Sequence, residues 1–336
     1  MRVTVKTMGN LVVRYRLLVM LAGIAIFGGL TLDDFLTIKT FRSVLDRAAV
    51  VGFLSLALTP LLIAGQIDLS IGSIMSLAAF TTIALQPAVG NFPAAFIGLG
   101  VGVLAGSINA AIIVFIRVSS LVATLATLLI GASLVLLISN SQPISSTDPT
   151  FGLPLTSVFL AILTPRSALF IAAATIMFVW LKATPSGRNL YALGSNMPAA
   201  ISAGINSNAY IGGAFILSGF CAGAAGVLQS LSSATGSPLA GSVLLIPAIT
   251  AVVIGGTRLE GGRGSSLATL GGVVAFGALT TLSEYHGIPS YTQAVYTGLL
   301  LILLITLDRI SGGGDGRTAR TLRRVALDPT ITRRNS

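Results

Sequence analysis

The chain has 336 residues, of which 54% are hydrophobic and only 9% are charged, and its formal net charge at pH 7 is +10. Soluble domains carry about 25% charged residues, so this composition excludes a soluble globular protein and predicts a polytopic membrane protein. The positive charge does not indicate nucleic-acid binding, because arginine and lysine cluster at the termini and in a few short segments, as in proteins oriented by the membrane. At about 20 residues per span, about ten helices fit, with no room for a separate soluble domain.

The first predicted span covers residues 17–30 and follows several basic residues. Such a start is also typical of a signal peptide. No small-x-small cleavage site follows, however, because residues 28–34 run directly into two acidic residues. We therefore expect an uncleaved span. Residues 31–47 mix charged and apolar side chains and predict a helix at the membrane interface.

Nine more apolar runs follow at intervals suited to membrane spans. They cover residues 48–64, 69–85, 94–116, 121–139, 167–181, 209–229, 243–254, 266–282 and 292–307. Between them we expect a proline-containing turn at 86–93, a loop rich in serine, proline and threonine at 140–166, and a loop of small polar residues at 231–242. Gly98, Gly102 and Gly106 repeat at every fourth position, which predicts close helix packing rather than a nucleotide site. The sequence therefore predicts an all-α fold.

An acidic residue lies between the second and third runs, in the segment G-Q-I-D-L-S-I-G-S. A carboxylate inside the membrane costs about 2.5–3.5 kcal/mol on insertion scales, and open backbone is tolerated there only beside protein or water. We interpret this segment as a helix break beside a translocation pathway, although Asp68 could also be a helix cap at the membrane surface. The candidate site residues of this break are Gly65, Gln66, Asp68, Ser70, Gly72 and Ser73.

A second glycine-rich break follows the eighth run and contains Gly255, Gly256 and Gly264. Its order of residues is similar to that of the first break with one residue inserted, and Glu260 takes the place of Asp68. The similarity is a hint that both breaks line one pathway. Coincidence in a glycine-rich membrane protein explains it equally well.

The distribution of basic residues predicts the orientation of the chain. With ten spans both termini lie on one side, and sixteen of the twenty lysines and arginines then fall on that side. The positive-inside rule therefore places both termini in the cytoplasm. The tail from residue 311 is basic and rich in glycine, so we expect it to be disordered or held on anionic lipid.

Motifs of several enzyme classes are absent from the sequence. It contains no G-x-x-x-x-G-K-[ST] phosphate loop, no H-E-x-x-H, no C-x-x-C and no nucleophile elbow. Cys221 lies in an apolar run and is best explained as a small core residue. His286, the single histidine, is expected in an outer loop, because metal and acid-base sites need several converging groups. We predict no enzymatic activity, no metal site and no cofactor.

Four motifs in the same order resemble those of the permeases of bacterial sugar ABC importers, the ribose, xylose, galactose and autoinducer-2 group. G-Q-I-D-L-S-I-G-S at 65–73 is similar to G-G-I-D-L-S-V-G-S, and residues 117–127 resemble K-x-P-P-x-I-x-T-L-G-T. Residues 187–205 match G-R-x-x-Y-A-x-G-x-N-x-x-A-A-x-x-S-G-I, and 255–264 resemble G-G-T-x-L-x-G-G-x-G. Gln66 replaces a glycine, Ser119 and Ser120 replace prolines, and Ala126 replaces a glycine.

The resemblance implies that residues 1–310 form a transmembrane permease domain in the bacterial inner membrane, for a sugar or sugar-like solute. It also implies three partners: a separate ATP-hydrolysing subunit, a second permease subunit that is identical or related, and a periplasmic solute-binding protein. An ion-coupled secondary transporter is an alternative, but it would place several ionisable groups within the membrane, where Asp68 is the single candidate. A purely structural or assembly subunit is a further alternative.

The predicted inner loop at 184–207 is long yet weakly polar. Pro185, Ser186 and Gly187 predict a turn, and a short helix with a compact apolar surface is expected from Pro198 to Gly204. Such a helix needs a groove in another protein or the lipid headgroups, but it lacks the basic residues of a lipid anchor. By resemblance the groove belongs to the ATPase, and the candidate coupling residues are Gly187, Arg188, Gly194, Asn196, Ala199, Ala200 and Gly204.

Overall fold

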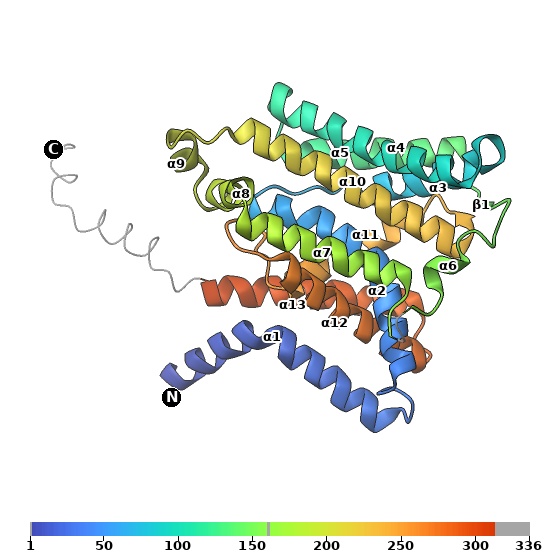
Figure 1. Cartoon of the computed structure of the whole chain (residues 1–336). Coiled ribbons are helices and arrows are strands. Elements are labelled where there is room, and N and C mark those ends of the chain that lie inside the picture. Colours follow the sequence, from blue (N-terminus) through green and yellow to red (C-terminus); the bar gives the residue numbers. More distant parts are fainter. Residues whose placement is uncertain (1, 160–161, 313–336) are drawn as a thin grey trace.

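The computed structural model describes residues 2–159 and 162–312, and these fold almost entirely into helices (Figure 1). Most of the predicted basic tail, residues 313–336, lies outside the described residues. The elements in chain order are α1 (Arg2–Thr31), α2 (Ile38–Ile63), α3 (Ile71–Val89), α4 (Asn91–Ala111), the π-helical turn η1 (Ile112–Ile116), α5 (Ser120–Ile138), β1 (Ile144–Ser145), α6 (Leu153–Thr156), α7 (Pro165–Ala183), α8 (Pro185–Ser195), α9 (Met197–Ser202), α10 (Ser207–Ser233), β2 (Thr235–Gly236), α11 (Ala240–Ile254), α12 (Ser266–Tyr285) and α13 (Ser290–Gly312).

Eight of the described helical segments are long and apolar enough to cross a membrane. They coincide with eight of the ten predicted spans. The remaining two predictions, the first and the eighth, correspond to shorter apolar helices, Leu17–Thr31 within α1 and Ala240–Ile254, which is α11. The all-α polytopic fold is therefore confirmed.

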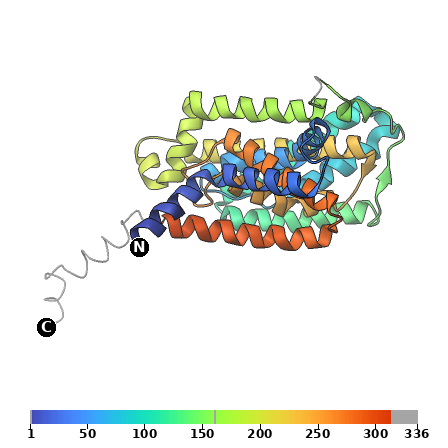
Figure 2. The ribbon, with the colours of Figure 1, turned by 90° about the horizontal axis from the view of Figure 1, so that it is seen from below.

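The long helices run between two ends of the bundle. Helices α8 and α9 lie at one end, here called the α8 end, whereas α6 and β1 lie at the other, the α6 end (Figure 1). The described beginning of α1 and the end of α13 both lie at the α8 end. Viewed from below, α7 and α13 run along opposite sides of the bundle (Figure 2). Both chain ends therefore lie on one side, as the count of ten spans requires.

Helix α2 occupies the centre of the bundle, and its Leu54, Leu56 and Leu58 are fully buried. Helix α4 packs against α10 through the glycines predicted to allow close packing. A Cβ added to Gly102 would lie 2.5 Å from the carbonyl oxygen of Gly219 and 2.7 Å from the Cα of Gly223. Glycine thus lets the two backbones approach, as in other membrane helix pairs.

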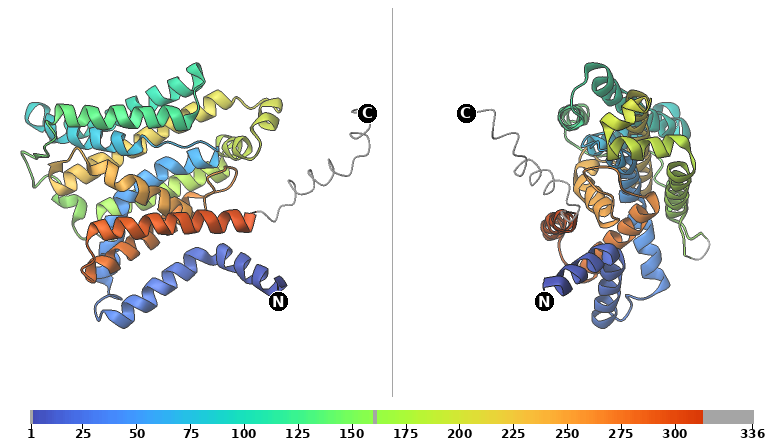
Figure 3. Two further views of the ribbon diagram at one scale, coloured as in Figure 1. Left: turned by 180° about the vertical axis from the view of Figure 1, so that it is seen from behind. Right: turned by 90° about the vertical axis from the view of Figure 1, so that its left-hand side faces the viewer.

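Many large apolar side chains remain exposed on the outer helices. Leu129 and Ile130 on α5 and Leu299 and Ile302 on α13 are each at least 60% exposed. Helix α1 also lies on the outside, beside α13, in the views of Figure 3. These surfaces suit lipid or a partner membrane protein rather than water.

Several predicted boundaries are wrong. The expected interfacial helix at 31–47 is instead a turn followed by the first part of α2, because Thr37 caps that helix and no breaker separates Ile38 from residue 48. The expected turn at 86–93 is confined to Gly90 (φ 83°), since Pro87 lies inside the last turn of α3 and Pro93 lies in the first turn of α4, where a missing N–H costs no helical hydrogen bond.

The loops of the α6 end are also more ordered than predicted. Strand β1 from the 140–166 loop pairs antiparallel with β2 from the 231–242 loop. Helix α10 continues to Ser233, and α11 begins at Ala240, three residues before the predicted start. His286 follows α12 directly as its C-cap and is exposed, with Nε2 3.1 Å from the Thr31 hydroxyl.

Candidate functional site

The first predicted break begins where α2 ends. Gly65 has a left-handed φ of 72°. Its N–H donates to the Leu62 carbonyl at 3.0 Å, and the Gln66 N–H donates to the Leu61 carbonyl at 2.8 Å. These two bonds form a Schellman cap, which ends the helix and satisfies carbonyls that would otherwise lie free. From there the chain crosses without regular structure to α3, which begins at Ile71.

Asp68 lies in this crossing and is fully buried. Its Oδ1 accepts hydrogen bonds from the Ser70 N–H at 2.9 Å and from the Ser70 hydroxyl at 2.5 Å. Its Oδ2 accepts from the Ser218 hydroxyl of α10 at 2.9 Å. Asn109 of α4 extends the group, since its side-chain N–H donates to the Ser70 hydroxyl at 2.7 Å. Asp68 thus connects the break to α10 directly and to α4 through the Ser70 hydroxyl.

Both readings of Asp68, as a cap and as part of the break, agree with these bonds. Asp68 does accept the N–H that precedes α3, but it does so inside the protein. Its carboxylate also has no exposed area, so it does not face an open cavity in this conformation. Ser73 completes the turn, because its hydroxyl donates to the Ser70 carbonyl at 2.9 Å. Gly72 has no room for a side chain, since an added Cβ would lie 2.9 Å from the Gly241 carbonyl oxygen.

The second break has the same local form as the first. Gly256 has a φ of 94° and its N–H donates to the Val253 carbonyl at 3.0 Å. The Thr257 N–H donates to the Val252 carbonyl at 3.3 Å. The similarity in sequence therefore reflects one kind of helix C-cap used twice. Gly255 packs against α12, where an added Cβ would lie 2.4 Å from the Ala268 carbonyl oxygen.

The two breaks meet at a point that also includes α8. The Gly262 N–H donates to the Ile63 carbonyl at 2.9 Å. A Cβ added to Gly194 would lie 1.8 Å from that same carbonyl oxygen, and one added to Gly261 would lie 3.0 Å from the Cα of Gly65. We call Gly65, Gly194, Gly261 and Gly262 the glycine junction. Since these backbones are in contact, a displacement of α8 must move both breaks or open the junction.

Tyr191 adds a side-chain link to this arrangement. Its hydroxyl, on α8, donates to the carbonyl oxygen of Gly264 at 2.8 Å. Partial burial raises the pKa of the Tyr191 hydroxyl above its usual value, so the neutral donor is the stable form. The predicted break residue Gly264 thus contacts the predicted coupling segment.

The predicted coupling residues form two helices rather than a turn and one helix. Pro185 and Gly187 belong to the first turn of α8, which is capped because the Thr184 hydroxyl accepts the Gly187 N–H at 3.2 Å. The predicted turn is therefore wrong. Asn196 caps α9, its Oδ1 accepting the Ala199 N–H at 3.2 Å. Arg188 is exposed on α8, and Gly204 follows α9 with a φ of 85°.

The expected apolar face of the short helix is only partly exposed. Ala199 and Ala203 are exposed and Ile201 is 50% exposed, but Ala200 is only 5% exposed. Ala200 therefore packs against this chain and is not on the outer face, contrary to expectation. Ala199 and Ile201, on either side of Ala200, form the surface of α9 that is open to a partner.

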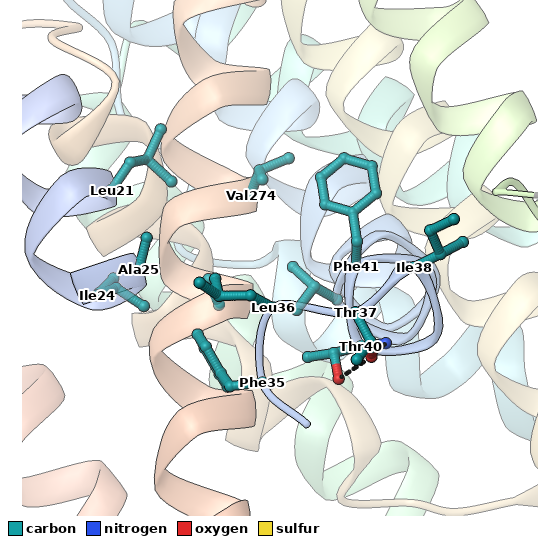
Figure 4. Close-up of a pocket in the computed structure, with 12 residues that line it drawn as sticks. Leu21, Ile24, Ala25, Phe35, Leu36, Thr37, Ile38, Thr40, Phe41 and Val274 are labelled. Atoms are coloured by element: carbon teal, nitrogen blue, oxygen red, sulfur yellow. Dashed lines mark hydrogen bonds between the residues drawn. The ribbon is translucent and has the colours of Figure 1, made fainter. Parts of the chain in front are cut away.

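Two cavities have no residue of the breaks in their walls. One has a volume of about 390 Å³ and lies between α1, the start of α2 and α12, with walls that include Leu21, Phe35 and Phe41 (Figure 4). Thr37 and Thr40 are its polar lining residues, and the Thr40 N–H and hydroxyl are already bonded within the turn. Such walls suit an apolar chain and not a polar solute. The other cavity is larger, has several polar groups in a mainly apolar wall, and opens at the α6 end.

Several residues of this site could not be identified from the sequence. Ser218 and Asn109 each lie in an apolar span, and their polarity alone does not indicate which carboxylate they contact. Gly261 and Gly262 lie within the predicted second break, but nothing in the sequence indicates their contact with Gly194. Within the described residues, no group of three or more histidine, cysteine, aspartate or glutamate side chains could hold a metal ion.

Comparison with known proteins gives consistent matches over most of the chain. Residues 41–304 match the family model described as branched-chain amino acid transport system / permease component. A "probable ABC transporter permease protein" of Sinorhizobium fredii is 31% identical, with 91% of this chain and 93% of that protein covered. A ribose import permease of Bacillus subtilis is 31% identical over 82% of this chain and 86% of its own length. A galactofuranose transporter permease of Escherichia coli is 32% identical over 78% and 77%. No solved structure matches the chain significantly.

Proposed function

Because the chain belongs to the family of branched-chain amino acid transport system permease components, we propose that it forms the translocation pathway of an ATP-binding-cassette importer for a sugar or sugar-like solute. It is a transport subunit and not an enzyme. The observation that carries the mechanism is the glycine junction, where α8 touches the ends of both helix breaks. A movement of α8 would therefore displace the two helix breaks directly.

The coupling role follows from the position of α8 and α9. Both helices lie at the end of the bundle that also holds the described beginning of α1 and the end of α13. The count of basic residues in the sequence and the positive-inside rule assign the side of the termini to the cytoplasm of a multi-pass inner-membrane protein. The family implies an ATP-hydrolysing subunit on that side and a solute-binding protein on the other. We propose that the exposed side of α9 docks on the ATPase, and that domain closure there displaces α8.

A second permease subunit, identical or related, is part of this proposal. The exposed apolar side chains of α5 and α13 suit contact with either lipid or such a subunit. Their composition does not distinguish the two, because lipid tails and leucine side chains are equally apolar.

The solute class rests on two of the relatives, whose names specify ribose and galactofuranose. A branched-chain amino acid, as in the family description, is a zwitterion and would need unpaired charges in the pathway. The charged pairs at the α6 end, Arg47 with Glu284 and Arg166 with Asp46, are already matched. This favours a neutral solute.

Ion-coupled secondary transport is not favoured. Such a transporter places ionisable groups within the membrane to bind its ion. The hydrogen bonds that Asp68 accepts come from Ser70 and Ser218. The carboxylates of Glu284 and Asp46 are paired with arginines and lie at the α6 end.

Uptake in intact cells tests this function and separates the alternatives. Labelled ribose, allose, galactofuranose and leucine would be offered to cells that express the chain with and without a co-encoded ATPase. We expect uptake of a sugar that requires the ATPase and persists when the proton gradient is dissipated. Uptake that stops with the proton gradient would support the secondary transporter, and uptake that is independent of the chain would support a structural subunit.

A further inference from the structure

Helix α11 is too short to cross the membrane. Its 15 residues span about 22 Å, whereas the apolar core of a bilayer is about 30 Å thick. Its first turn lies deep in the bundle, because the Gly241 N–H donates to the Ser76 hydroxyl of α3 at 2.9 Å and a Cβ on Gly241 would lie 1.8 Å from the Gly72 carbonyl oxygen. Since Gly72 is in the first turn of α3, α11 starts next to the first break.

A cavity of about 1080 Å³ occupies the space that this short helix leaves. It is lined by the first turns of α11, the last turn of α10, the middle and end of α12, the first turns of α13 and part of α2. The ends of α10 and α12 and the start of α13 belong to the α6 end (Figure 1), whereas α11 starts deeper in the bundle, beside Gly72. The cavity therefore extends from the α6 end toward the start of α11. We call it the α11 cavity.

Formal charges in the α11 cavity are paired. Arg47 and Glu284, both in its wall, form an ion pair across α2 and α12. Arg166, also in the wall, is bonded to Asp46, which in addition accepts from the Thr164 hydroxyl at 2.5 Å. An anion or a cation would have to break one of these pairs, so the cavity favours a neutral ligand.

Uncharged hydrogen-bonding groups line the rest of the cavity. The half-buried Gln229 side chain has no hydrogen-bond partner among the described residues. The Gln293 side-chain N–H donates to the Ile288 carbonyl at 3.0 Å, which leaves its oxygen as an acceptor. The hydroxyls of Ser232 and Ser242 donate to the carbonyls of Leu228 and Leu239, at 2.6 and 2.8 Å, and can still accept.

Apolar side chains form the remaining surface of the cavity, among them Val273, Phe276 and Pro247. A mainly apolar wall with a few placed polar groups is typical of sites for small organic ligands, which have volumes of about 300–1,000 Å³. A hydroxylated carbon skeleton presents both kinds of surface. The α11 cavity is larger than the cavity beside α1 and has more polar groups in its wall.

We propose that the α11 cavity is an entry site within this single subunit, where a neutral polyhydroxylated solute such as a monosaccharide binds before it reaches the break at Asp68. This inference rests on the proposed function. The solute enters at the α6 end, exchanges hydrogen bonds with Gln229 and Gln293, and lies against the start of α11. From there Gly241 and Gly72 connect the cavity to the first break.

Thiol labelling tests whether the cavity is open to the outer solution, and does so without transport. Cys221, the single cysteine, is buried and would be replaced by alanine. Ser242→Cys, in the cavity wall, would then be compared with Val295→Cys, which is 63% exposed on α13 but outside the cavity. We expect a membrane-impermeant methanethiosulfonate reagent added outside intact cells to label position 242 at least about tenfold faster. Equal or slower labelling would overturn the proposal.

A second experiment tests whether the solute uses the cavity. Ala294 of α13 lines it, whereas Ile176, which is 70% exposed on α7, does not. The panel of sugars is ribose, allose and galactofuranose. Ala294→Trp is expected to lower ATPase-dependent uptake of the sugar that wild type transports at least about tenfold, whereas Ile176→Trp is expected to retain it at equal membrane expression. Wild-type uptake by Ala294→Trp would overturn the entry site and leave the proposed function intact. If wild type transports no sugar of the panel, the proposed solute class fails, and the ligand assigned to the cavity fails with it, whatever the labelling shows.

Discussion

The Ser218 hydroxyl of α10 donates a hydrogen bond to the carboxylate of Asp68 at 2.9 Å, 150 residues away in the chain. This bond and the two from Ser70 give a buried carboxylate three donors without a cation. A buried charge is tolerated only when it is hydrogen-bonded, so the structure of the break depends on all three. The path of the chain between α2 and α3 is thereby connected to α10.

Replacing Asp68 is expected to disturb the break. Asp68→Ala removes the acceptor and leaves the Ser70 N–H without its partner, at a cost of about 1–3 kcal/mol for a buried donor. Transport should fall strongly. Asp68→Asn should retain more, because an amide oxygen still accepts a hydrogen bond. Uptake at matched expression, with thermal stability measured in detergent, checks both expectations.

Ser218→Ala provides a control for that experiment, because it removes one of the three donors and leaves the carboxylate in place. Its effect should be smaller than that of Asp68→Ala, and in the double variant the two effects should not add. Wild-type uptake by Asp68→Ala would contradict the role of this residue.

The isolated chain is expected to hydrolyse no ATP. The sequence contains no phosphate loop, and the family supplies hydrolysis from a separate subunit. The measurement is phosphate release by the purified chain and by the chain reconstituted with its ATPase. Turnover by the chain alone that survives removal of contaminating ATPases would contradict the assignment as a transport subunit.

Adding one methyl group at the glycine junction is expected to impair transport. In Gly194→Ala the new Cβ would overlap the Ile63 carbonyl oxygen, which also accepts the Gly262 N–H. The backbones must separate, at a cost of about 1–3 kcal/mol for overpacking. We expect Gly194→Ala to have a lower melting temperature than wild type. Its uptake should fall by a larger factor than the amount of the protein in the membrane.

Gly213→Ala is the matched control for the junction. Gly213 lies within α10 and has no atom within 4 Å of an added Cβ. In a helix interior the change to alanine is favourable by up to about 1 kcal/mol, so stability should be unchanged or higher. Equal defects in the Gly194 and Gly213 variants would show that the defect does not arise from contact between α8 and the breaks.

The spans and breaks could be predicted from the sequence because they depend on local properties. A run of about 20 apolar residues defines a span wherever it packs, and glycine after an apolar run predicts a C-cap such as those at Gly65 and Gly256. Helix packing through Gly102 was predictable for the same reason. These features need no knowledge of the neighbouring helices.

Contacts between distant segments could not be predicted in this way. Ser218 of α10 donates to Asp68, and Asn109 of α4 donates to the Ser70 hydroxyl beside it. Each is one polar residue among several in its span. Residues 38–47 were assigned to a separate helix at the membrane interface because they include charged side chains. They are the first part of α2, since nothing between Ile38 and residue 48 interrupts a helix. Likewise, the sequence does not indicate which of the apolar residues Ala199, Ala200 and Ile201 of α9 faces inward. In the structure the buried one is Ala200.

The exposed side of α9 is the proposed contact with the ATPase, and the structure changes which residue should test it. Ala200 is 5% exposed, so Ala200→Glu would bury a charge within this chain and should reduce its folding and insertion. Ile201 is 50% exposed on the same helix. Ile201→Glu should leave the chain inserted at wild-type levels but weaken its contact with the ATPase, because a charge in an apolar docking surface must lose its hydration.

Cross-linking between residue 201 and the ATPase, together with uptake, measures this effect. Both should fall in Ile201→Glu and both should be retained in Asn208→Glu, which adds the same charge at an exposed position in the first turn of α10. Since α8 joins α9 directly and touches both breaks at the glycine junction, loss of the contact should abolish uptake while the ATPase still hydrolyses ATP. If Ile201→Glu transports normally and still co-purifies with the ATPase, coupling must act through the segment from Arg258 to Arg263, which contains Gly261 and Gly262 of the junction.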